Sequence, residues 1–132
     1  ALSNNKRKVF CIDGDGSMIM HMGVLTTLAQ MKPKNFFHIL LNNKVHESVG
    51  GQETSIKYID LKPLIKSNSY ENFLSIDDKD MLASSFKKFV DSEGPSFIEI
   101  SIDPGSRENL GRPTESPIKN KVNLMSFIDK SN

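Results

Sequence analysis

The sequence predicts an α/β fold in three layers (α/β/α), in which helices cover both faces of a mostly parallel β-sheet. Two observations lead to this prediction. Short apolar runs of strand length alternate along the chain with segments whose apolar residues recur every three or four positions. The first two apolar runs are nearly uninterrupted, which is typical of parallel strands covered on both faces. With 132 residues, the chain is expected to form one domain over residues 1–132.

Strands are predicted where a short apolar run is bounded by turn residues. These segments are residues 9–12, 36–41, 72–76 and 96–102. After the first strand, Met18, Met22, Leu25 and Leu28 follow one another at spacings of four, three and three residues. This periodicity predicts a single helix, which Pro33 ends.

Three further helices are predicted from caps and from periodicity. Asp60 is expected to cap a short helix that begins near Leu61. Asp77 is expected to cap a longer helix, which the Gly94-Pro95 dipeptide ends. The apolar stripe of the last helix is expected to consist of Ile118, Val122, Met125 and Ile128.

Two polar motifs directly follow the first two strands. Gly14-Asp15-Gly16 comes after the first strand, and Asn42-Asn43 comes after the second. Ligands of open parallel sheets bind at the carboxyl ends of strands, so both motifs are expected at the same edge. The acid turn also precedes a helix, whose free N–H groups attract an anion. Because Asp15 and Asn43 offer oxygen ligands to Mg²⁺, a metal–phosphate pair is the predicted ligand.

The acid turn has a second interpretation. The stretch "DGDGS" resembles the D-x-D-G-T/S signature of haloacid dehalogenase-type phosphatases, with Asp13 as nucleophile and Asp15 as general acid. Such an enzyme also needs downstream acids to close a magnesium site. The available carboxylates are those of Asp77, Asp78 and Asp80. They are more simply explained as a negatively charged first helical turn, and Asp13 as a residue that bonds a local backbone N–H.

Four stretches distributed over most of the chain carry a family resemblance. They are "CIDGDGSMIMHMG", "LNNKVHESVGGQ", "DDKDML" and "GPSFIEISIDPGSRENLGRPTESP". Gly14-Asp15-Gly16, followed after 25 residues by Asn42-Asn43, also resembles a thiamine diphosphate motif. Together they resemble the phosphonopyruvate decarboxylases of the thiamine diphosphate-dependent 2-oxoacid decarboxylase family. The resemblance implies the diphosphate-binding domain of the thiamine diphosphate-binding fold, without its first strand and helix, as a fragment of a longer chain.

The resemblance also implies an activity and its partners. The reaction is the decarboxylation of 3-phosphonopyruvate to phosphonoacetaldehyde and CO₂, with thiamine diphosphate and Mg²⁺ as cofactors. This chain would supply the diphosphate and metal half of the site and would be inactive alone. Its implied partners are the 2-oxoacid, a pyrimidine-binding domain of the same or a neighbouring chain, and further copies in a homo-oligomer. Three alternatives stay open: sulfopyruvate or another 2-oxoacid as substrate, the phosphatase, and a non-catalytic subunit that completes a partner's site.

By the same resemblance, individual residues receive expected roles. The metal ligands are Asp15, Asn43 and the main-chain carbonyl of Val45. The cofactor-binding residues are Gly14, Asp15, Gly16, Ser17, Met18, His21, Asn43 and His46. His46 and Glu47 are candidate catalytic residues, with His46 as a donor or proton carrier; ordering of the loop is the simpler alternative. Arg107 and Arg112 suit a phosphonate, but a surface loop or a subunit contact is the favoured explanation for them.

Composition limits the remaining classes of function. The 17 Lys and Arg residues against 16 Asp and Glu residues give a net charge of +1, which offers no argument for nucleic acid or an anionic membrane. The only cysteine, Cys11, excludes an intrachain disulfide and favours a reducing, cytoplasmic compartment. The sequence has no apolar run long enough to span a bilayer.

Overall fold

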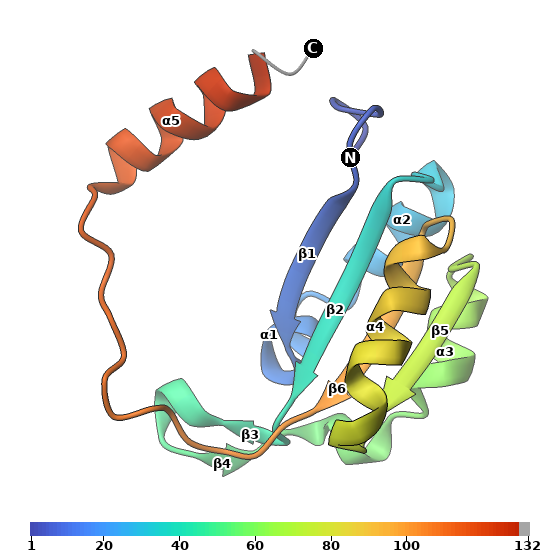
Figure 1. Ribbon diagram of the computed structural model, residues 1–132. Helices are drawn as coiled ribbons and strands as arrows, with labels where there is room; N and C mark the ends of the chain where they lie inside the picture. The colour runs from blue at the N-terminus through green and yellow to red at the C-terminus, as the bar shows by residue number, and fades with distance from the viewer. Residues whose placement is uncertain (130–132) are drawn as a thin grey trace.

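The computed structural model describes residues 1–129 and places a parallel sheet between layers of helices. The four strands of the sheet lie in the order β1-β2-β6-β5, and every neighbouring pair is parallel (Figure 1). Their bounds are β1 Val9–Gly14, β2 Phe36–Asn42, β5 Asn72–Ile76 and β6 Ser96–Ser101. The predicted fold class is confirmed, and the strand predicted at residues 72–76 has the predicted bounds.

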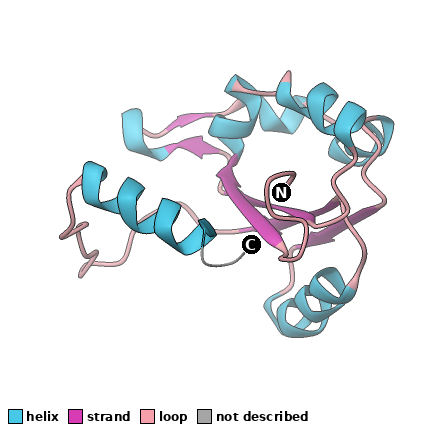
Figure 2. Cartoon of the chain, turned by 90° about the horizontal axis from the view of Figure 1, so that it is seen from above, coloured by secondary structure: helices cyan, strands magenta, loops and turns pink. Residues whose placement is uncertain are grey.

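Helices cover the two faces of the sheet unequally, as the view along the sheet shows (Figure 2). One face carries α1 (Asp15–Met20), α2 (Val24–Met31) and α3 (Leu61–Ser67). Their buried side chains share a core with the sheet; its fully buried members are Met18, Leu25, Leu40, Ile56, Leu61, Ile65, Tyr70 and Phe97. The other face carries α4 (Leu82–Asp91), which buries Phe89 against Phe37, Ile39, Ile76 and Ile98.

The expectation that both faces of the first strand are covered is wrong. Exposed and half-buried residues alternate along β1, and Ile12 is 64% exposed. Phe10 and Ile12 pair with Phe37 and Ile39 of β2, so they lie on the face that carries α4. Because α4 contacts β5 and β6 at the opposite side of the sheet, this face of β1 is not covered by a helix among residues 1–129.

The prediction of a single helix after the first strand is wrong as well, because the structure has two helices there. α1 ends at Met20 and α2 begins at Val24, with His21 to Gly23 between them. Met18 on α1 and Leu25 on α2 are both buried in the same core cluster. The apolar residues therefore keep a helical spacing across the break, so the break could not be predicted from their periodicity.

The predicted capping residues are only partly correct. Asp78, rather than Asp77, caps the turn η3 (Lys79–Met81) that precedes α4, since its carboxylate accepts the backbone N–H of Asp80 at 2.9 Å. Asp60 flanks α3 as predicted, but its side chain makes no capping hydrogen bond.

The polar loop after β2 contains an antiparallel hairpin. Its short strands are β3 (Val45–His46) and β4 (Gln52–Glu53), joined through the turn η1 (Glu47–Val49). A second short turn, η2 (Ser55–Tyr58), follows and buries Ile56 in the core. The hairpin thereby stands at the carboxyl edge of the sheet (Figure 1).

The last predicted helix forms as α5 (Pro117–Asp129), but its apolar stripe does not pack on the sheet. Ile118 is 78% exposed, and Val122 and Met125 are also more than half exposed. Figure 1 shows α5 apart from the sheet, on the side of β1, after an extended segment. Near its end, the guanidinium of Arg7 lies 4.9 Å from the ring centre of Phe127.

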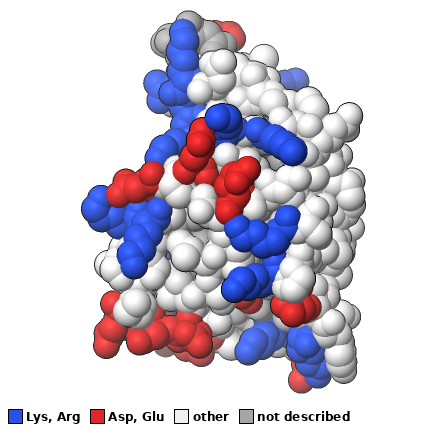
Figure 3. Space-filling model, turned by 90° about the vertical axis from the view of Figure 1, so that its right-hand side faces the viewer, with Lys and Arg blue, Asp and Glu red and all other residues white. Residues whose placement is uncertain are grey.

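The charged surface is mixed in sign. On the face shown in Figure 3, groups of Lys and Arg side chains lie among groups of Asp and Glu side chains. The surface also carries exposed ion pairs, such as Lys34–Glu93 at 2.9 Å and Lys87–Asp91 at 2.5 Å. Within residues 1–129, no helix has the length and apolar character needed to cross a membrane.

Candidate functional site

A cavity of about 410 Å³ lies where the carboxyl ends of β1 and β2 meet the β3–β4 hairpin. The strands bring the two polar motifs together here, as their positions after neighbouring strands predict. Eight of the predicted site residues line the cavity: Gly14, Asp15, Gly16, Ser17, Asn43, Val45, His46 and Glu47.

Asp15 is a buried carboxylate with little internal compensation. It is the first residue of α1, and it is 1% exposed. Within residues 1–129 its side chain has one hydrogen-bond partner, the hydroxyl of Thr54, which donates to Oδ2. A buried negative charge is costly unless another group compensates it, and a cation in the cavity would do so. The residue therefore fits the role of a metal ligand.

Asn43 is held in an orientation that leaves its amide oxygen available. Its Nδ2 donates to Oε2 of Glu47 at 2.9 Å, and its Oδ1 accepts the backbone N–H of Val45 at 3.1 Å. An amide oxygen has two lone pairs, so Oδ1 can still bind one more group. Together with the carboxylate of Asp15 and the carbonyl of Val45, it forms a set of hard oxygen donors, the class that Mg²⁺ prefers.

The neighbouring residue Asn42 has a different, structural position. It is buried, its Nδ2 donates to Oε1 of Glu99 on β6 at 2.8 Å, and its Oδ1 accepts the N–H of Lys44 at 3.2 Å. Its own carbonyl accepts the N–H of Ile102 at 3.0 Å. Asn42 therefore fixes the start of the loop to the centre of the sheet.

His46 packs directly against the glycine turn. A Cβ atom added at Gly16 would lie 2.7 Å from Nδ1 and 2.9 Å from Cε1 of His46. The missing side chain of Gly16 thus leaves the space that the imidazole occupies. A Cβ atom added at Gly14, in contrast, would have no atom within 4 Å, and Gly14 also lines the cavity.

Two predicted cofactor-binding residues do not line this cavity. The side chain of Met18 is buried in the core between α1 and the sheet. His21 lies at the break between α1 and α2 and is exposed. α1 is six residues long, and His21 directly follows it.

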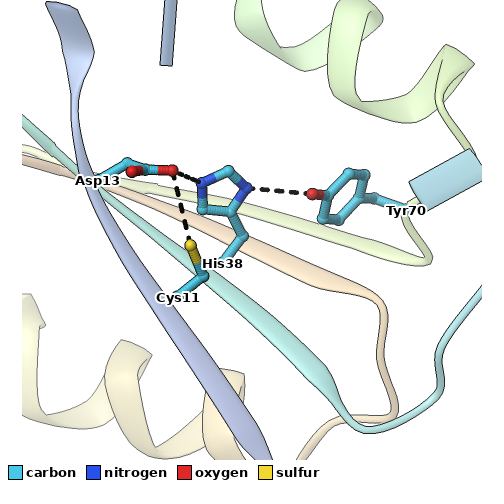
Figure 4. Close-up of polar contacts among 4 residues, drawn as sticks. All are labelled: Cys11, Asp13, His38 and Tyr70. Carbon is cyan, nitrogen blue, oxygen red and sulfur yellow. Dashed lines mark hydrogen bonds and ion pairs between the residues drawn. The ribbon is translucent and has the colours of Figure 1, made fainter. Parts of the chain in front are cut away.

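Among the described residues, Asp13 bonds other side chains and not a local backbone N–H, contrary to the expectation. Its Oδ2 lies 2.8 Å from Nε2 of His38 and 3.6 Å from Sγ of Cys11 (Figure 4). On the other side of the imidazole, Nδ1 lies 3.1 Å from the hydroxyl of Tyr70. Sequence reasoning missed His38, although a histidine within a buried apolar strand is itself a signal, because a buried imidazole needs polar partners.

Burial shifts the pKa values of His38 and Cys11. Burial lowers the pKa of His38, and the hydrogen bond and charge of Asp13 oppose that shift. Burial raises the pKa of the Cys11 thiol, and the Asp13 carboxylate raises it further. At neutral pH the imidazole is therefore neutral, with Nε2–H donating to Asp13 and Nδ1 accepting from Tyr70.

The acids considered for a phosphatase magnesium site do not lie next to Asp13. Asp77 and Asp78 follow β5, which is the edge strand opposite β1, so β2 and β6 separate them from Asp13. The carboxylate of Asp78 is used by the backbone of Asp80. The acids that such an enzyme needs around its nucleophile are thus at the far side of the sheet.

The chain is similar in sequence to known decarboxylases. The chain is 33% identical to the phosphonopyruvate decarboxylase of Streptomyces viridochromogenes, over 92% of this chain and 31% of that protein. It is 37% identical to that of Streptomyces hygroscopicus, over 84% of this chain and 28% of the relative. It is also 32% identical to the sulfopyruvate decarboxylase subunit beta of Methanococcus maripaludis, over 98% of this chain and 69% of the relative. The chain thus spans less than a third of the first two relatives.

The fold has a solved counterpart as well. An X-ray structure from Mycobacterium smegmatis, named as a candidate thiamin diphosphate-dependent enzyme, superposes with a TM-score of 0.60 at 23% identity. The superposition covers 76% of this chain and 19% of that one, and it supports the fold alone. Residues 1–100 match the family described as thiamine pyrophosphate enzyme, C-terminal TPP binding domain. The chain therefore belongs to the thiamine pyrophosphate enzymes, as their C-terminal cofactor-binding domain.

Proposed function

We propose that residues 1–132 form one domain that supplies the diphosphate- and magnesium-binding half of the active site of a 2-oxoacid decarboxylase. The proposed reaction converts 3-phosphonopyruvate to phosphonoacetaldehyde and CO₂. The observation that carries the proposal is the buried Asp15 beside Asn43 in a cavity at the carboxyl ends of two parallel strands. When bound, thiamine diphosphate supplies the electron sink that makes loss of CO₂ from a 2-oxoacid feasible.

The proposed metal ligands are Asp15, Asn43 and the carbonyl of Val45. Their donor set is entirely oxygen, and a divalent cation would offset the buried charge of Asp15. The hydroxyl of Thr54 and the carboxylate of Glu47 orient two of these ligands through hydrogen bonds. We therefore assign Glu47 a positioning role on Asn43, in addition to its place at the cavity wall.

The proposed diphosphate position is the turn from Gly14 to Ser17. Gly14 precedes α1 without a side-chain capping bond, so the first backbone N–H groups of the helix remain available to an anion. Gly14 has no atom near the position of a Cβ, which permits close approach of an oxyanion. For Met18 the proposed contact is restricted to its main chain, because its side chain is in the core.

His46 is the proposed proton carrier. Its ring touches the turn at Gly16 and lines the cavity, so it lies next to both proposed ligand positions. An imidazole ring can donate a hydrogen bond from one nitrogen and accept one at the other, which suits a proton carrier. The β3–β4 hairpin fixes its backbone, since its carbonyl accepts the N–H of Gly51 at 2.9 Å.

The substrate and the partner are proposed from the relatives. Phosphonopyruvate decarboxylases match at 33–37% identity and sulfopyruvate decarboxylases at 30–33%, which favours the phosphonate over the sulfonate. The partner is a pyrimidine-binding domain, on the same chain or a neighbouring one. Because several relatives are named as beta subunits, a chain that completes a partner subunit's site is the second hypothesis.

Phosphorus NMR of 3-phosphonopyruvate tests the proposal. The full-length polypeptide, with any partner subunit, is incubated with substrate, thiamine diphosphate and Mg²⁺. We expect a phosphonoacetaldehyde signal that is absent without either cofactor and absent in an Asp15→Asn variant. An Asp91→Asn variant is the matched control, since Asp91 is exposed and its ion pair with Lys87 lies at the surface.

Other outcomes would contradict specific parts of the proposal. Growth of an inorganic phosphate signal would indicate hydrolysis and reject the decarboxylase. An unchanged spectrum, together with CO₂ release from sulfopyruvate, would reject phosphonopyruvate as the substrate. Full activity of Asp15→Asn at low Mg²⁺ would reject the assigned metal site.

A further inference from the structure

A second group of metal-binding side chains lies beside the candidate cofactor site. Cys11 and Asp13 are on β1, His38 is on the adjacent strand β2, and their donor atoms all lie within 4.8 Å of one another (Figure 4). The register explains this proximity, because Cys11 is paired with His38 and Asp13 is two residues further along the same face. We call these three residues the Cys–Asp–His cluster.

The spacing of the donor atoms is close to that of a tetrahedral zinc site. Bond lengths of about 2.3 Å to sulfur and about 2.1 Å to nitrogen or oxygen give tetrahedral edges of about 3.4–3.6 Å. The distance from Sγ of Cys11 to Oδ2 of Asp13 is 3.6 Å, which already matches. The distance from Nε2 of His38 to Oδ2 of Asp13 is 2.8 Å, a hydrogen-bond length. To fit a tetrahedral site this edge has to open by about 0.6 Å, and the three donor atoms as a group already lie within 4.8 Å of one another.

Tyr70 is placed as an outer partner of the imidazole. A metal-bound histidine usually donates its other ring N–H to an oxygen that fixes the orientation of the ring. The hydroxyl of Tyr70 lies 3.1 Å from Nδ1 of His38, and it can donate or accept a hydrogen bond. When a cation replaces the Nε2 proton, Nδ1 becomes the donor to Tyr70, and both buried side chains stay hydrogen-bonded.

An ion has access to the cluster from solvent. The side chain of Asp13 is 32% exposed and Cys11 is half-buried, whereas His38 and Tyr70 are buried. The exposed side leaves room for a water as the fourth ligand, with the three protein ligands fixed on two hydrogen-bonded strands. The mixture of sulfur, nitrogen and oxygen donors also differs from the oxygen donors around Asp15.

We propose that the Cys–Asp–His cluster binds a divalent cation of the zinc class. The ion would join β1 to β2 directly before the turn from Gly14 to Gly16. The thiolate and imidazole select against Mg²⁺, which would stay at the oxygen donors of Asp15 and Asn43. This site does not depend on the proposed decarboxylase activity.

Cobalt substitution tests the proposal directly. The full-length polypeptide is reduced, freed of metal, saturated with Mg²⁺ and thiamine diphosphate, and given one equivalent of Co²⁺. We expect a near-ultraviolet sulfur-to-cobalt band and visible bands of tetrahedral intensity. Cys11→Ser should remove the near-ultraviolet band and weaken Zn²⁺ binding, measured by chelator competition, by at least about tenfold. Asp13→Asn should weaken it as well, while Asp91→Asn should not.

The outcomes separate binding from folding. Because His38 is buried, His38→Gln risks loss of the fold, so the decision depends on Cys11→Ser with an unchanged circular dichroism spectrum. Absence of the sulfur-to-cobalt band in the unsubstituted protein would overturn the proposal. An unchanged band or an unchanged Zn²⁺ affinity in Cys11→Ser would overturn it equally, since the ion would then be bound elsewhere.

Discussion

Replacing Gly16 by alanine should separate activity from stability. The added Cβ would lie 2.7 Å from Nδ1 of His46, about 0.7 Å inside the 3.4 Å at which ordinary contact begins. Overpacking in a rigid core costs about 1–3 kcal/mol. His46 is a half-buried side chain that can rotate outward, so we expect the lower end, about 1 kcal/mol of unfolding free energy.

The expected loss of activity is much larger. A misplacement of about 1 Å at a reacting group can cost about a hundredfold in rate. With the decarboxylase assay of the full-length polypeptide, we expect kcat of Gly16→Ala to fall by about that factor. The control is Gly23→Ala, because no atom lies within 4 Å of its added Cβ and its φ of −57° suits alanine. The control should keep its activity and its stability.

A double-mutant cycle gives the result that would refute this reasoning. If the alanine acts by moving His46, Gly16→Ala should cost little further activity in a His46→Ala background. An equal loss in both backgrounds would mean that the methyl group acts elsewhere, for example by blocking the diphosphate. Full activity of Gly16→Ala would show that the position of the imidazole does not matter.

Two further predictions concern stability. In Gly94→Ala the new Cβ would lie 2.5 Å from the carbonyl oxygen of Phe36, and a backbone atom cannot move aside as a side chain can. Urea denaturation should therefore show a loss of about 2–3 kcal/mol in the free energy of unfolding. An unchanged denaturation midpoint would contradict the packing described. Burial lowers the pKa of His38, so below its usual pKa of about 6.5 the unfolded chain binds more protons than the folded one. Stability should therefore fall as the pH decreases from about 6.5 through the folded-state pKa, and His38→Gln should flatten this slope in melting curves recorded with a chelator; a stability that rises on acidification would reverse the assigned direction.

The strands were predictable because their signal is local. Residues 72–76 read as a strand from composition and bounding turns, and β5 has the same bounds. The break between α1 and α2 was not predictable, since Met18 and Leu25 stay in one core on both sides of it. The open face of β1 was not predictable either, because it depends on α4 lying over the other half of the sheet.

The cavity was predictable to the extent that it follows from strand ends. Parallel strands place their carboxyl ends at one edge of the sheet. To predict that Asp15 and Asn43 line the same cavity, it was enough to identify the two strands and to assume that they are neighbours. The contact between Asp13 and His38 required the cross-strand register, which only the structure provides. For the same reason, sequence spacing alone could not distinguish the structural Asn42 from the cavity-lining Asn43.

The hairpin after β2 is attached near the site at both of its ends. Asn43 lies at its start, and at its end Thr54 donates its hydroxyl to Asp15 and its N–H to the carbonyl of Lys44. The tip between them, at Val49 to Gly51, is exposed. In evolutionary terms, these two regions can change at different rates. Under the proposed function, mutation at the exposed tip would be tolerated more readily than mutation of the proposed cofactor-binding residues at the base.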